Sequence, residues 1–324
     1  MITIKCKWRQ FIKQSCCNKT AGLFSYYISI MFNKMKMKTS KNLFAFILGL
    51  MSVFLMHNTS FGRGKMNMPF NLITYNIRMN TQGDGVNAWP LRKDKVAGLL
   101  KFHQTDIFNV QEALPEQMDD LVNSFPDFDH VGVGRDDGKR AGEHMAIFFS
   151  KTRFEKLNDG MFWLSENPSK PGCGWDAQCN RTVTWIKLKD KITKKSFYVF
   201  DTHFDHIGNI AREESAKLIL KSIKEINTEN LPLILTGDFN LTKNALPIQL
   251  ILKELNDARD KSLSLPYGPD GTCCGFDVKI VPHTIDFIFI NEKVEVVRHG
   301  VLSDSFGLSY PSDHLPVLVE VNIQ

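Results

Sequence analysis

Six widely separated segments of the chain share one form, an apolar run that borders a carboxylate, an amide or an imidazole. The polar residues at these places are Asn76, Glu112, His203, Asp238 with Asn240, Asp286, and Asp313 with His314. A single acid or Asn in such a place usually caps a helix or a turn. Six such segments in one chain favour a common functional site over six separate caps, because side chains at strand ends lie at the rim of a sheet.

These residue types suit metal-assisted attack of water on phosphorus. A hard cation such as Mg²⁺ takes carboxylate oxygens, and Glu112 is a good primary ligand. Asp238 can orient the attacking water or take its proton. Asn240, two residues further along an extended segment, would point to the same side and donate to a phosphoryl oxygen. An imidazole stabilises developing charge when an acid fixes its tautomer, and His314 with Asp286 can form that pair.

The elements that must position these residues follow from hydrophobic periodicity. Apolar runs predict about ten strands, and helical spacing predicts four helices, near residues 91–102, 114–125, 210–226 and 245–255. Strands and helices alternate from about residue 69 to the end, with no internal repeat and no linker. This interleaving favours a single mixed α/β domain over a helix bundle or an all-β fold.

In their order along the chain, the motifs resemble those of the endonuclease/exonuclease/phosphatase superfamily, the DNase I-like proteins. The motifs are Tyr75-Asn76-Ile77-Arg78, Val110-Gln111-Glu112, Thr202-His203, Gly237-Asp238-Phe239-Asn240, Ile285-Asp286-Phe287 and Ser312-Asp313-His314. Each motif alone is a weak signal, whereas the ordered set is a strong one. The resemblance covers roughly residues 69–323.

The resemblance implies an α/β fold of the α+β type, a four-layer sandwich of two mixed β-sheets flanked by helices. It also implies a role for each matching position. Glu112 would bind the metal, with Asn76 and Asp313 beside it, and Asn76 and His203 would contact the phosphate. Asp238 would activate water, Asn240 would orient the substrate or the transition state, and Asp286 would orient His314. The metal implied is Mg²⁺, with Mn²⁺ as a substitute.

Arg181 resembles the basic residue that enters this cleft beside the phosphate. From the residues alone, a surface arginine at the start of a strand is an equally good interpretation. We therefore expect a hydrolase whose substrate is a nucleic acid, a sugar phosphate or an inositol phosphate. The alternatives are a catalytically inert binding protein on the same fold and, among the enzymes, a sugar or inositol phosphatase rather than a nuclease. The sequence implies no protein partner.

The charge distribution bears on the substrate. The chain has 324 residues and a formal net charge of +5. Residues 1–62 hold nine Lys and Arg and no acid, so the 31 basic and 35 acidic side chains of residues 63–324 give a net charge of −4. Broad electrostatic binding of nucleic acid needs excess positive charge, and residues 63–324 have none. The net charge does not exclude a local basic cleft.

The same asymmetry predicts an export signal. A basic segment at residues 34–41 precedes an apolar run at residues 43–56, which is short for a membrane span. We expect that residues 1–34 lie upstream of the true translation start and that residues 35–62 form a signal peptide. Residues 63–324 would form a single domain. The mature protein would then be periplasmic or secreted and carry no stable membrane anchor; a retained N-terminal membrane helix is the alternative.

Two cysteines lie close together in a Gly- and Pro-rich loop. The spacing of Cys173 and Cys179 permits a short disulfide in an oxidising compartment, and we expect that bridge, with two free thiols as the alternative. No Cys-x2-Cys pair occurs, which argues against a structural zinc site.

Overall fold

The computed structural model of the chain describes residues 68–324, except residues 274 and 280. The expected signal peptide and upstream segment therefore lie outside the described residues. All described residues belong to one compact unit. No helix among them has the length and hydropathy that crossing a bilayer requires.

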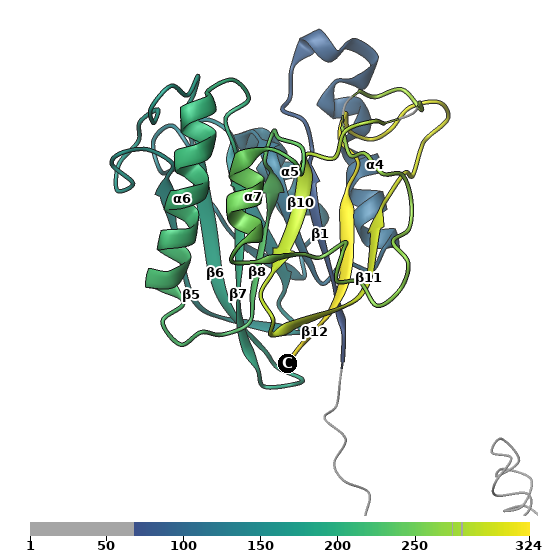
Figure 1. The fold of residues 1–324 in the computed structure, drawn as a ribbon. Helices are drawn as coiled ribbons and strands as arrows, with labels where there is room; N and C mark the ends of the chain where they lie inside the picture. The colour runs from purple at the N-terminus through teal and green to yellow at the C-terminus, as the bar shows by residue number, and fades with distance from the viewer. Residues whose placement is uncertain (1–67, 274, 280) are drawn as a thin grey trace, which may run out of the picture. The chain divides into compact units, whose positions relative to one another are not determined.

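Two six-stranded sheets form the centre of the fold (Figure 1). In spatial order, sheet A consists of β11 (Val294–Val301), β12 (Val317–Ile323), β1 (Phe70–Asn76), β2 (Ile107–Ala113), β4 (His144–Ser150) and β3 (Phe128–Val131). Sheet B consists of β5 (Phe154–Trp163), β6 (Thr182–Asp190), β7 (Ser196–His203), β8 (Leu233–Asp238), β10 (Asp286–Ile290) and β9 (Asn256–Asp257).

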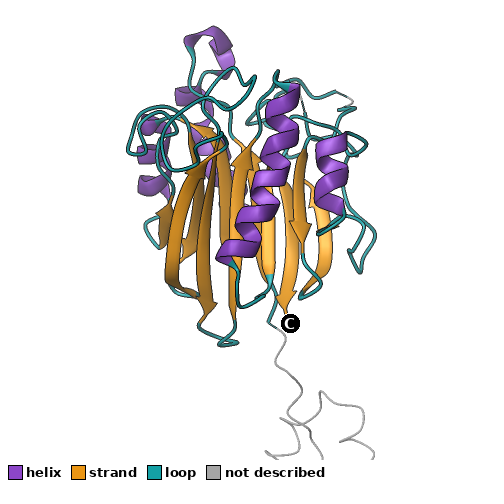
Figure 2. Ribbon diagram, turned by 60° about the vertical axis from the view of Figure 1, so that its left-hand side comes forward, coloured by secondary structure: helices purple, strands orange, loops and turns teal. Residues whose placement is uncertain are grey.

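Helices cover the outer face of each sheet (Figure 2). On sheet A, α4 (Trp89–Phe102) and α5 (Pro115–Ser124) pack through a cluster that includes Val96, Leu121 and Phe108; the short 3-10 helix η1 (Gln82–Asn87) precedes α4. On sheet B, α6 (Asn209–Ile226) and α7 (Leu246–Leu252) pack through a second cluster, which includes Ile219 and Ile248. A third cluster fills the space between the sheets. The expected four-layer sandwich is confirmed.

The buried layer between the sheets explains why the sequences of the strands are nearly continuous apolar runs. Leu72 and Ile107 of sheet A share one buried cluster with Val199, Ile234 and Ile288 of sheet B. Burial of apolar surface stabilises the fold by about 25 cal/mol per Å², so this layer contributes strongly to stability. Strands buried on both faces, as the central strands are here, lose the alternation of polar and apolar residues.

Each sheet has one parallel pair of strands at its centre, and the two pairs place the polar strand ends. β1 runs parallel to β2, and β7 runs parallel to β8, while all other pairings are antiparallel among the described strands. Buried hydrogen bonds join the two pairs: Asn109 Nδ2 donates to Thr236 Oγ1 at 2.7 Å, and Gln111 Nε2 donates to Asp201 Oδ1 at 2.7 Å. These bonds fix how one sheet lies on the other.

Gly237 lets β7 and β8 approach closely just before Asp238. Its φ is +148°, and a Cβ there would lie 2.0 Å from the backbone oxygen of Thr202. We expect Gly237→Ala to lower the free energy of unfolding by about 3 kcal/mol, because the overlap involves backbone that cannot move aside. Urea denaturation followed by circular dichroism measures the change.

Gly98 offers the matched control for this substitution. It is exposed in α4, and a Cβ there meets no atom within 4 Å. Gly98→Ala is expected to be neutral or to stabilise by up to about 1 kcal/mol, because alanine favours the helix. Equal unfolding midpoints for the two variants would contradict the close approach at Gly237.

Candidate active site

The predicted site residues meet where the two parallel pairs end. Asn76, His203 and Asp238 are the last residues of β1, β7 and β8. Asp286 begins β10 and is paired in register with Asp238. His314 lies three residues before β12. Side-chain ligand atoms of Glu112, His203 and Asp238 lie within 4.8 Å of one another, as do those of Asp238, Asp286 and His314.

Asn76 connects the carboxylates of the two sheets. Its Nδ2 donates to Glu112 Oε1 at 2.9 Å and to Asp238 Oδ2 at 3.0 Å. Its Oδ1 accepts from the backbone N–H of Arg78 at 3.0 Å, which fixes the amide orientation. One buried amide therefore holds an acid of sheet A against an acid of sheet B.

A β-bulge turns Glu112 toward the site. The pairing of β2 with β4 shifts register between Val110 and Ala113, and Glu112 has a φ of +64°. A residue other than glycine in this region costs of order 1–3 kcal/mol, and such outliers gather at functional sites. Burial would raise the pKa of Glu112, but the hydrogen bond from Asn76 and the charge of His314 outweigh it and lower that pKa. Glu112 is therefore ionised at neutral pH.

His314 and two acids form a coupled group. His314 Nδ1 lies 2.9 Å from Asp286 Oδ2, and its Nε2 lies 3.8 Å from Asp238 Oδ2, so the predicted contact with Asp286 is present. Burial alone would lower the pKa of His314, but the carboxylates of Asp286 and Asp238 raise it well above its usual value. Burial and Asp286 raise the pKa of Asp238 to about 7, against the opposing charge of His314. A base with such a pKa suits proton transfer near neutral pH.

The hydrogen bonds of Asn240 fix the tautomer of His203. Asn240 Nδ2 lies 3.0 Å from the backbone oxygen of Phe204 and 3.0 Å from His203 Nε2. Because the carbonyl needs a donor, the amide nitrogen must face both, so His203 Nε2 accepts and Nδ1 carries the proton. Burial and the charges of Arg181 and Arg135 lower the pKa of His203 well below its usual value, which keeps the ring neutral.

The extended segment expected between Asp238 and Asn240 is wrong. Asn240 has a φ of +51°, and its backbone N–H donates to Asp238 Oδ1 at 2.8 Å. The chain therefore turns back after β8. This turn brings the Asn240 side chain to His203.

Glu143 is a site residue that the sequence analysis missed. It is buried beside His203: its Oε2 lies 3.8 Å from His203 Nδ1 and accepts from Arg135 Nη1 at 2.6 Å. Burial raises the pKa of Glu143 despite the adjacent Arg135. The available signal was an acid next to the start of an apolar run, whereas most of the predicted site residues lie where apolar runs end.

Arg181 lies near His203, and Asp313 lies near Glu112 and His314. Arg181 is 4% exposed, so its interpretation as a surface residue is wrong. Asp313 Oδ2 lies 3.9 Å from Arg78 Nε. Burial raises the pKa of Asp313, opposed by His314, and the negative charge of Glu112 raises it further. Asp313 and Glu112 thus act on each other as like charges, an arrangement that a cation would relieve.

The donor set fits a hard divalent cation. Glu112 is ionised, and each of its oxygens accepts one hydrogen bond, from Asn76 and from the backbone N–H of Met79 at 3.0 Å, which leaves a lone pair on each. Oxygen donors of this kind are those that Mg²⁺ prefers. Glu112, with Asn76 and Asp313 beside it, would hold the ion. The geometry does not select Mg²⁺ over Mn²⁺, since both take oxygen ligands.

The expected bridge between Cys173 and Cys179 is wrong, because both are free cysteines. Their sulfur atoms face different acceptors. Cys173 Sγ donates to Asn180 Oδ1 at 3.5 Å, and Cys179 Sγ donates to Asp205 Oδ2 at 3.7 Å.

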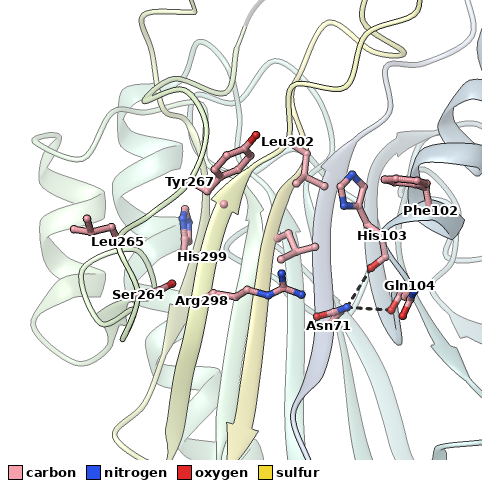
Figure 3. A pocket seen from close by; sticks show the side chains of 12 residues that line it. Asn71, Phe102, His103, Gln104, Ser264, Leu265, Tyr267, Arg298, His299 and Leu302 are labelled. Carbon is pink, nitrogen blue, oxygen red and sulfur yellow. Dashed lines mark hydrogen bonds between the residues drawn. The ribbon is translucent and has the colours of Figure 1, made fainter.

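A separate cavity of about 500 Å³ is formed by α4, β1, β11 and the loop that contains Tyr267 (Figure 3). Two of its polar side chains are paired with the protein, His103 with Asp304 at 3.0 Å and Arg298 with Glu320 at 2.6 Å, whereas Nδ1 of the buried His299 has no hydrogen-bond partner among the described residues. None of the groups of metal-ligating side chains found among the described residues includes a residue that lines it. The strand-end cluster therefore remains the candidate active site.

Comparisons with known proteins give the same picture. The sequence profile described as the Endonuclease/Exonuclease/phosphatase family matches residues 73–314. An endonuclease/exonuclease/phosphatase from Bacteroides vulgatus is 39% identical with a TM-score of 0.75, and the match covers 79% of this chain and 100% of that one. A mannosyl-6-phosphatase from Bacteroides thetaiotaomicron is 37% identical with a TM-score of 0.76, covering 78% and 99%. An uncharacterized protein of Acanthamoeba polyphaga mimivirus is 26% identical over 168 residues, which span 50% of this chain and 62% of the viral protein.

Proposed function

The chain belongs to the endonuclease/exonuclease/phosphatase family, and from this premise we propose that it is a metal-dependent phosphoesterase that uses water as the nucleophile. One observation carries the proposal: Asp238, with a pKa of about 7, lies between Asn76 of sheet A and the His314–Asp286 pair. A catalytically inert binding protein would not need a buried acid tuned to neutral pH beside an imidazole. Such perturbed groups gather at catalytic sites.

The residues would divide the reaction as follows. Asp238 would orient the attacking water and take its proton, since its pKa allows both protonation states near neutral pH. His314, kept protonated by Asp286, would stabilise charge that develops on the phosphoryl oxygens. A metal ion held at Glu112 would act as a Lewis acid on a phosphoryl oxygen.

His203 and Asn240 would lie beside the phosphate without donating a hydrogen bond to it. Both amide hydrogens of Asn240 are already committed, one to Phe204 and one to His203. In this arrangement its Oδ1 is left to face the substrate as an acceptor. Donation to the phosphate would therefore fall to Arg181 rather than to the Asn240 amide nitrogen.

Among phosphate esters we propose a sugar phosphate as the substrate. The net charge of −4 for residues 63–324 disfavours a long polyanion. The mannosyl-6-phosphatase, 37% identical over 99% of its length, supports a phosphomonoester of a sugar. We also propose export to the periplasm or the medium, which rests on the basic and apolar pattern of residues 34–56 alone.

The first test compares esters with and without metal. We expect hydrolysis of p-nitrophenyl phosphate and mannose 6-phosphate with Mg²⁺, a fall to background in EDTA, and recovery when Mg²⁺ or Mn²⁺ is restored. Bis-(p-nitrophenyl) phosphate and single-stranded DNA are the matched diester controls. Hydrolysis of diesters alone would indicate a nuclease, and hydrolysis of none would indicate the inert binding protein.

A further inference from the structure

A second cluster of side chains lies beside His203. It consists of Cys179, Arg181, Asp205 and His206, from the loop before β6 and the loop after β7. Ligand atoms of Cys179, Asp205 and His206 lie within 4.8 Å of one another, a spacing that a metal ion could use. The bonds that each group already makes decide what this cluster can bind.

Asp205 is committed to the protein. Its Oδ1 accepts from the backbone N–H groups of Ile207 at 2.9 Å and Gly208 at 2.8 Å, and its Oδ2 accepts from that of Gln178 at 3.0 Å. Arg181 Nε lies 3.7 Å from the same Oδ2. A cation would have to displace these donors and lie against a guanidinium. The cluster is therefore built to bind acceptor oxygens rather than a metal.

Arg181 determines which donor His206 presents. Arg181 Nη2 lies 3.2 Å from His206 Nδ1, and a guanidinium can only donate. His206 Nδ1 therefore accepts, and the neutral ring carries its proton on Nε2. His206 is exposed, whereas Arg181 is buried with Nε and Nη1 lacking a hydrogen-bond partner among the described residues. Buried N–H groups without partners are costly. Nε faces Asp205, so Nη1 is the group that an oxygen of a ligand would satisfy.

The cluster adjoins the candidate active site and is preformed. His206 follows His203 by three residues, and the charge of Arg181 helps to lower the pKa of His203. Asp176, from the same loop as Cys179, accepts from the backbone N–H of Ala211 at 2.7 Å and so caps α6. A Cβ at Gly208 would lie 2.6 Å from Asp176 Oδ1, so the two loops are closely packed.

We propose that His206 is a specificity-determining residue whose Nε2–H donates to a hydroxyl oxygen of the sugar, while Arg181 fixes the imidazole and faces the phosphate. The ligand class is a phosphomonoester of a polyhydroxylated alcohol. A neutral N–H donor next to a guanidinium suits a ligand with an anionic group and uncharged oxygens close together. The inference rests on the proposed substrate class but not on turnover.

The test measures binding in EDTA, so that hydrolysis does not interfere. Isothermal titration calorimetry would compare mannose 6-phosphate with inorganic phosphate for the wild type, His206→Ala and His206→Gln. We expect His206→Ala to weaken binding of mannose 6-phosphate roughly 3- to 10-fold, the worth of one neutral hydrogen bond, and to leave phosphate binding unchanged. His206→Gln should recover part of the loss, because its amide can donate.

His103→Ala is the matched control, since His103 lies in the separate cavity of Figure 3 and pairs with Asp304. It should change neither affinity. Equal weakening for both ligands, no change in either, or a zinc ion that the wild type binds and His206→Ala loses would overturn the inference. A wild type that binds the sugar phosphate but never hydrolyses it with Mg²⁺ would instead overturn the proposed function.

Discussion

The Glu112→Gln variant is expected to fold normally and to hydrolyse phosphate esters roughly 10²- to 10³-fold more slowly than the wild type in Mg²⁺. Glutamine keeps the size of the side chain, and one of its groups can still face Asn76. It removes the single anionic oxygen donor that the bulge of β2 turns into the site. Steady-state kinetics over a range of Mg²⁺ concentrations, with thermal unfolding as the check on folding, measures the effect.

Glu116→Gln is the matched control, because Glu116 is an exposed acid four residues away in α5. It should leave both the rate and the Mg²⁺ dependence unchanged. A Glu112→Gln protein with full activity at low Mg²⁺ would show that the metal is held elsewhere.

The Asp286→Asn variant is expected to lose up to roughly 10⁴-fold in kcat, the loss that follows when an acid that orients a catalytic histidine is neutralised. Asp286 lies 2.9 Å from His314 Nδ1 and is one of the two carboxylates that raise the pKa of His314. Without that charge, burial lowers the pKa of His314, so its proton is lost at a lower pH. The alkaline limb of the rate profile should therefore move to lower pH.

The acid limb provides an internal comparison. Asp286 also raises the pKa of Asp238, so the limb that reports ionisation of Asp238 should move to lower pH as well. Asp119→Asn, which removes an exposed partner of Arg140, is the control and should leave both limbs in place. A lower rate with an unchanged pH profile would mean that Asp286 acts only on folding.

The convergence of the site could be predicted because parallel strands end at the same edge of a sheet. Asn76, His203 and Asp238 each end a strand. The apolar runs before them therefore predicted both that these residues lie at the edge of a sheet and that they lie close together. Glu143 could not be found in this way, because it precedes β4 and reaches His203 from the side. Its closest contact, with Arg135, joins residues whose spacing has no periodic signal.

β5 shows the corresponding limit for the fold. It lies at the edge of sheet B, and most of its central residues are exposed, among them Glu155, Lys156 and Asp159. An edge strand exchanges apolar surface for charge, which removes the hydrophobic pattern that identifies inner strands. The turn at Asn240 did have a local signal, because Asp238 accepts from the backbone N–H two residues further on and asparagine tolerates a left-handed backbone. The expectation of an extended segment overlooked that signal.

The side-chain amide of Asn76 hydrogen-bonds to Glu112 of sheet A and to Asp238 of sheet B, so the site lies at the interface between the two sheets. A ligand that bridges Glu112 on one sheet and Asp238 on the other can bind only while the sheets stay docked. Its binding is thus linked to the unfolding equilibrium of the domain and not only to local order around the site. Ligand at 100 times its dissociation constant would add about 2.7 kcal/mol to the free energy of unfolding. The melting temperature of the protein therefore reports how much of the site is occupied, whichever phosphate ester binds there.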